Sequence, residues 1–62
     1  MSDIAARLTL LAGELERVAL QIRDASEDQT LGKRAVNVDQ VALCVEYSAR
    51  DLLRTANDLP KG

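Results

Sequence analysis

Residues 4–25, IAARLTLLAGELERVALQIRDA, and residues 38–59, VDQVALCVEYSARDLLRTANDL, decide the fold of this 62-residue chain. In each segment, apolar residues recur at intervals that alternate between four and three. The first series is Ile4, Leu8, Leu11, Leu15, Val18, Ile22 and Ala25, and the second is Val38, Ala42, Val45, Ala49, Leu52, Ala56 and Leu59. Such a series keeps one face of an α-helix apolar along its whole length. The sequence therefore predicts two long amphipathic helices.

The first helix is expected over about residues 3–31. Ser2 or Asp3 can cap its start by accepting a hydrogen bond from a free amide of the first turn. Gly32 can end it, because glycine adopts the left-handed conformation of a helix terminus without a Cβ clash. A turn over about residues 32–37 then follows.

The second helix is expected over about residues 38–58. Asn37 and Gln40 fit a variant capping box, and the flanking Val36 and Val41 fit a hydrophobic staple. Pro60 disfavours helical backbone at the residue before it, which sets the end. A turn this short makes the two helices antiparallel neighbours. We therefore expect one all-α domain over residues 1–62, an antiparallel two-helix hairpin.

The two apolar series are expected to form the interface between helices. Recurring alanines at seven-residue spacing, such as Ala12 and Ala49, predict a close approach of the helix axes with large residues packed against small ones. The interface residues that we expect, within the hairpin or between hairpins, are Leu8, Leu11, Leu15, Val18, Ile22, Val45, Ala49 and Leu52.

A partner chain is expected because the apolar arc of the first helix is wider than one neighbouring helix covers. A chain of this length buries only about 60% of its unfolded surface and is marginal alone. With Cys44 as the single cysteine and no histidine, an intrachain disulfide and a His/Cys metal site are both excluded. We expect two hairpins to form a homodimeric four-helix bundle, with a hetero-complex with another helical protein as the alternative.

This pattern resembles the Rop-type plasmid RNA regulators in three respects: a length of about sixty residues, two heptad series, and the position of the turn. The resemblance implies a helical hairpin and a dimeric bundle. It implies RNA binding as one possible activity, but fold alone does not fix function. Without a shared sequence motif, the resemblance assigns no site residue.

The candidate partner-binding residues lie opposite the apolar series of the second helix: Leu43, Tyr47, Arg50 and Arg54. Tyrosine and arginine are enriched at binding hot spots, so the group fits recognition of a protein partner. The same side chains can contact a phosphate or stack on a base. The simpler interpretation is a solvated outer face with two stray apolar residues.

The composition argues against several functional classes. Without histidine, a nucleophile–base pair or a phosphate-binding glycine-rich loop, we expect no catalysis, no metal and no cofactor. A net charge of −2 with interspersed signs does not favour nucleic acid. No apolar run approaches the roughly 20 residues that span a bilayer, and the first residues lack the basic region of a signal peptide. We therefore expect no membrane association and a cytoplasmic location.

The function expected from these observations is that of a small regulatory or adaptor protein of bacterial, phage or plasmid type. It would act by helix-mediated protein–protein interaction. The alternatives are an RNA-binding four-helix-bundle regulator of Rop-like architecture and a structural subunit of a larger helical complex.

Overall fold

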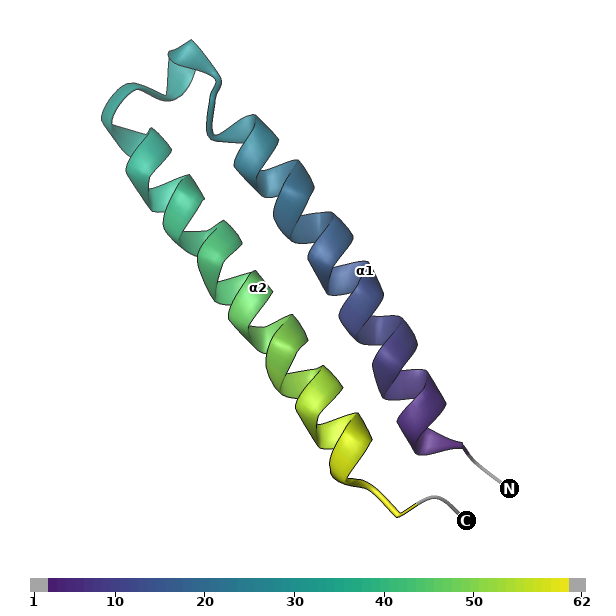
Figure 1. The fold of residues 1–62 in the computed structure, drawn as a ribbon. Coiled ribbons are helices and arrows are strands. Elements are labelled where there is room, and N and C mark those ends of the chain that lie inside the picture. Colours follow the sequence, from purple (N-terminus) through teal and green to yellow (C-terminus); the bar gives the residue numbers. More distant parts are fainter. Residues whose placement is uncertain (1–2, 61–62) are drawn as a thin grey trace.

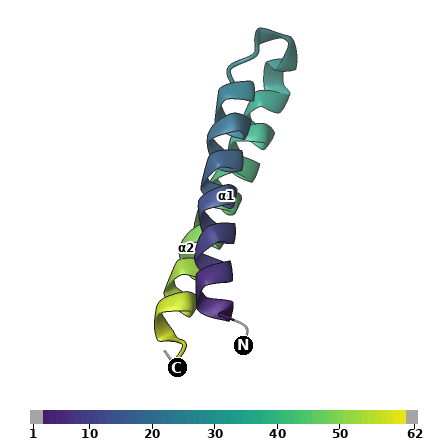
Figure 2. The same ribbon diagram turned by 90° about the vertical axis from the view of Figure 1, so that its right-hand side faces the viewer.

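Two antiparallel α-helices lie side by side along almost their whole length in the computed structural model, which describes residues 3–60 (Figure 1). Helix α1 is Ile4–Ala25, the 3₁₀ segment η1 is Gln29–Arg34, and helix α2 is Ala35–Asp58. Seen from the side, the hairpin is a slender rod whose helices cross at a shallow angle (Figure 2). The predicted helical hairpin is confirmed, and the residues described contain no strand.

Asp3, one of the two predicted N-cap residues, caps the start of α1. Its Oδ1 accepts a hydrogen bond of 3.1 Å from the amide of Ala6, and its carbonyl accepts one from the amide of Arg7. The backbone of Asp3 is not helical, as expected for a residue that accepts these bonds from outside the helix. The alternative cap, Ser2, lies outside the described residues.

Helix α1 ends at Ala25, six residues before the predicted end. Short polar side chains provide the physical reason, because they offer the backbone partners other than the next helical turn. The hydroxyl of Ser26 donates to the carbonyl of Arg23 at 2.6 Å. Asp28 then accepts two hydrogen bonds from Thr30, one from its amide at 2.9 Å and one from its hydroxyl at 2.7 Å.

Gly32 adopts the positive φ that was predicted, at φ 56° and ψ −126°, but it does so inside the turn and not at the end of α1. Helix α2 then starts at Ala35, three residues earlier than expected, with the amide of Ala35 donating to the carbonyl of Gly32. Asn37 therefore lies inside the first turn, and the predicted capping box is wrong. The end of α2 at Asp58, with an extended backbone at Leu59, is confirmed.

The fully buried core consists of alanines. Within residues 3–60, the buried positions are Ala12, Ala19, Ala42, Ala49 and Ala56. The large apolar residues of the seam are only half-buried: Leu8, Leu15, Ile22, Val38, Val45, Leu52 and Leu59. Two rows of alanines let the helix axes approach closely, so the larger side chains beside them reach around the seam and remain partly open to solvent.

One part of the predicted seam needs correction. Leu11 and Val18 are 47% and 43% exposed, and Ile4 and Ala25 are exposed as well. On α1, the second row of the seam is the alanine row that includes Ala12 and Ala19. The row of Ile4, Leu11, Val18 and Ala25 therefore lies outside the contact between α1 and α2.

Candidate functional site

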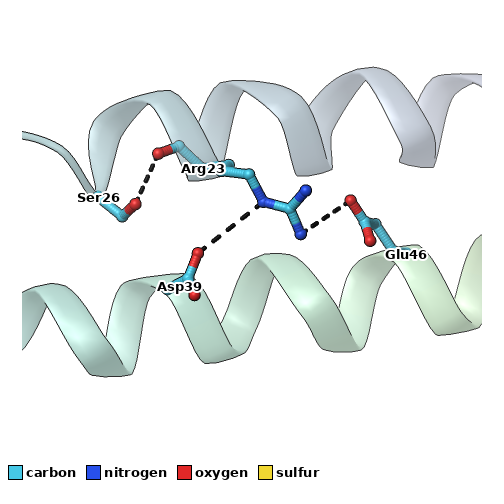
Figure 3. A network of polar contacts seen from close by, with 4 residues as sticks. All are labelled: Arg23, Ser26, Asp39 and Glu46. Atoms are coloured by element: carbon cyan, nitrogen blue, oxygen red, sulfur yellow. Dashed lines mark hydrogen bonds and ion pairs between the residues drawn. The ribbon is translucent and has the colours of Figure 1, made fainter.

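Arg23 joins the two helices on one face of the hairpin. Its Nη2 lies 3.0 Å from Oε1 of Glu46, and its Nε lies 3.9 Å from Oδ1 of Asp39. In Figure 3 the guanidinium extends from α1 across to α2 and lies between the two carboxylates. We call this side of the hairpin the bridged face.

The alanine rows of the seam lie next to the bridged face. Ala19 precedes Arg23 by four residues, and Ala42 precedes Glu46 by four, and residues four apart are neighbours on a helix surface. Both alanines have no exposed surface. The ion pairs and the side chains around them therefore cover the seam on this side.

A shallow groove of about 220 Å³ crosses the bridged face between the helices. Its lining consists of Glu16 and Leu20 from α1 and Glu46 and Arg50 from α2. Leu20 is 63% exposed, so the groove offers an apolar surface with charged groups of both signs at its border. A small apolar side chain with polar neighbours has the right chemistry to enter it.

Of the four predicted partner-binding residues, Arg50 lines this groove, and the other three share its side of α2 at helical spacings. The guanidinium carbon of Arg50 lies 5.9 Å from the ring centroid of Tyr47, within the range of a cation–π contact. Tyr47 is 58% exposed, and Leu43, one heptad before Arg50, is also exposed. Arg54 is exposed one heptad after Tyr47.

The contribution of α1 to this surface was not predicted from the sequence. Leu20 lines the groove together with Arg50, which joins residues that are thirty positions apart in the chain. Its only signal in the sequence is a leucine off the apolar stripe, and the pairing with α2 depends on the register of the hairpin. We use the name recognition patch for Leu20, Leu43, Tyr47, Arg50 and Arg54.

The opposite side of the hairpin is apolar, and we call it the apolar face. Leu11 neighbours Leu8 and Leu15 on α1, and Val41 neighbours Val45 on α2, at the spacings of three and four that place residues side by side. Its exposed large residues are Ile4, Leu11, Val18 and Val41. The half-buried leucines and valines of the seam lie beside them, so the face is apolar mainly along α1 and at Val41 on α2.

Several predicted interface residues hold a defined place in the hairpin. Ala49 is buried in the seam, while Leu8, Leu15, Ile22, Val45 and Leu52 are half-buried there. Leu11 and Val18 belong to the apolar face. Gly13 of α1 has open space around it, with no neighbouring atom within 4 Å of the position that a Cβ would occupy.

Hydrogen bonds within the turn shift the titration of Asp28. The amide of Thr30 and then its hydroxyl donate to this carboxylate and lower its pKa, because both bonds stabilise the charged form. Asp28 is fully exposed and distant in sequence from the recognition patch. It is a structural group of the turn.

Residues 3–60 contain no cluster of three or more His, Cys, Asp or Glu side chains that could hold a metal ion. Neither helix in this range is long and apolar enough to cross a membrane. No protein-family model, curated protein or solved structure matches the chain.

Proposed function

We propose that this chain is a small non-enzymatic adaptor or regulatory protein that binds another protein through the recognition patch. The observation that carries the proposal is the joint groove of Leu20 and Arg50, extended by Tyr47 and Leu43. Tyrosine and arginine are enriched at binding hot spots, and a tyrosine on a rigid helix offers a large contact area at a small entropy cost.

The charges of the groove favour a protein partner over nucleic acid. Arg50 shares the groove with the carboxylates of Glu16 and Glu46. These carboxylates would repel a phosphate backbone, which dominates the affinity of nucleic-acid binding. A protein segment with an apolar side chain and a charged neighbour matches the mixed charges of this groove.

A comparative capture experiment tests this proposal. Tagged wild-type protein, the double variant Tyr47→Ala/Arg50→Ala and the control Leu10→Ala are incubated with an extract of the source organism. Leu10 is a 70% exposed leucine of α1 that is absent from the groove lining. We expect a protein that wild type and control retain and that the double variant loses.

Nuclease treatment and salt titration then distinguish the two kinds of partner. A protein partner remains bound after nuclease treatment, and its affinity falls only moderately between 50 and 200 mM salt. Loss of the partner on nuclease treatment, or a steep fall with salt, supports the RNA-binding alternative, because neutralised phosphates release counterions. Equal retention by the double variant would contradict a role of the recognition patch.

A further inference from the structure

The hairpin exposes more surface than a compact protein of its mass. The accessible surface is 5110 Å², whereas a compact protein of 6.8 kDa exposes about 4,000 Å². A standard protein–protein interface buries about 800 Å² on each partner. The excess is therefore large enough for one such interface.

The two sides of the seam differ in how far their residues are buried, and this difference places the expected interface on the apolar face. On the bridged side, Ala19 and Ala42 have no exposed surface. On the other side, the leucines and valines of the seam are only half-buried. Among residues 3–60 as a whole, no buried residue is larger than alanine. A second layer of helices over this face would bury these leucines and valines, together with Leu11 and Val18.

We propose that a second copy of this chain covers the apolar face and that the two hairpins form a four-helix bundle with both turns at the same end. The face is complementary to itself. The row on α1 carries the large residues Ile4, Leu11 and Val18, whereas the row on α2 carries Val41 followed by the smaller Ser48 and Thr55. A two-fold axis along the bundle sets the large row of each copy on the small row of the other.

One pair of opposite charges at the border of the apolar face fits the same arrangement. Arg7 on α1 and Asp58 on α2 flank the two rows at the open end of the hairpin. With the turns together, Arg7 of one copy lies beside Asp58 of the second copy. With the turns at opposite ends, α2 would lie antiparallel on α2, and Asp58 of one copy would lie near the turn of the second copy, away from its Arg7.

Oligomeric state and two matched variants test the proposal. In sedimentation equilibrium at micromolar concentration, wild type should have twice the chain mass, and its melting temperature should rise with protein concentration. Leu11→Glu should shift the protein to the monomer, because it places a charge in the buried layer. Leu10→Glu, which changes the neighbouring leucine outside the apolar face, should remain a dimer.

A distance measurement tests the arrangement without relying on a destabilised variant. In a Cys44→Ser/Lys33→Cys protein, spin labels mark the two turns. We expect a label-to-label distance well below the roughly 33 Å length of α1. A monomeric wild type with a concentration-independent melting temperature, equal effects of Leu10→Glu and Leu11→Glu, or labels separated by the length of the hairpin would each overturn the proposal. None of these outcomes depends on the partner of the recognition patch.

Discussion

The guanidinium of Arg23 in α1 lies 3.0 Å from the carboxylate of Glu46 in α2 and closes one side of the hairpin (Figure 3). This single contact shows which rows of the two helices share a face. The rows next to Arg23 and Glu46 are alanines, and the rows that point to the other side are apolar and exposed. The ion pair therefore marks the bridged face, and the apolar face lies on the opposite side of the hairpin.

The Arg23–Glu46 pair is expected to contribute little to stability at ordinary salt. The side chains are 45% and 24% exposed, so solvent screens the pair, and a coupling of about 0.5 kcal/mol is expected in a double-mutant cycle. Arg23→Glu should destabilise more than Arg23→Gln, because it places a third carboxylate beside Asp39 and Glu46. Urea unfolding at one protein concentration measures both effects. A coupling that stays unchanged in 1 M salt would contradict an exposed ion pair.

Ala49→Leu should destabilise the hairpin by about 1–3 kcal/mol, because the larger side chain overpacks a seam in which Ala49 is fully buried. Ala6→Leu is the matched control, since Ala6 is exposed and the change adds the same atoms to a helix surface. Thermal or urea unfolding of the two variants at equal concentration gives the comparison. A neutral Ala49→Leu variant would mean that the alanine rows do not face each other closely.

The two internal glycines are expected to respond in opposite directions to alanine. At Gly32, φ is 56°, so Gly32→Ala strains the backbone and should cost about 1–3 kcal/mol, although a Cβ there meets no atom within 4 Å. Gly13 lies inside α1 with equally open space around it, so Gly13→Ala should stabilise by about 0.5–1 kcal/mol. Equal effects at the two positions would contradict the turn geometry.

Asp28 should titrate below its unfolded-state pKa because Thr30 donates two hydrogen bonds to the carboxylate. A lowered folded-state pKa means that the contribution to stability is present above the unfolded-state pKa and is lost as the pH falls through the folded-state pKa. Carbon-detected NMR titration measures the shift directly. Thr30→Ala should raise the pKa only part of the way, since the amide bond remains. An unchanged pKa in that variant would show that the hydroxyl makes no bond.

Periodicity and backbone chemistry made much of the fold predictable. The spacing of the apolar residues indicated two helices, Asp3 was one of two predicted caps, and Pro60 set the end of α2. These are local effects, determined by residues within one or two turns of each other. The helix boundaries around the turn were harder to predict. The side chains of Ser26 and Asp28 bind backbone groups that helix α1 would otherwise use, and the outcome of that competition depends on how the chain enters α2.

The candidate site was only partly predictable, because part of it depends on how the two helices pair. Tyr47 and Arg50 are three residues apart on one helix, so their proximity follows from helical geometry alone. Leu20 joins them only through the antiparallel register of α1 and α2. The ion pairs of Arg23 with Asp39 and Glu46 were likewise not predictable from the sequence. They depend on which turns of the two helices lie side by side.

The sequence by itself determined that the chain forms two amphipathic helices and an antiparallel hairpin, since heptad spacing gives each helix an apolar face and a short turn makes the two helices antiparallel neighbours. Only the tertiary structure decided which row accompanies Leu8, Leu15 and Ile22 in the seam. The alanine row and the row of Leu11 flank them equally on α1. Close approach of the axes selects the alanines, because small side chains on both helices permit it. The more hydrophobic row is thereby left exposed, on the apolar face.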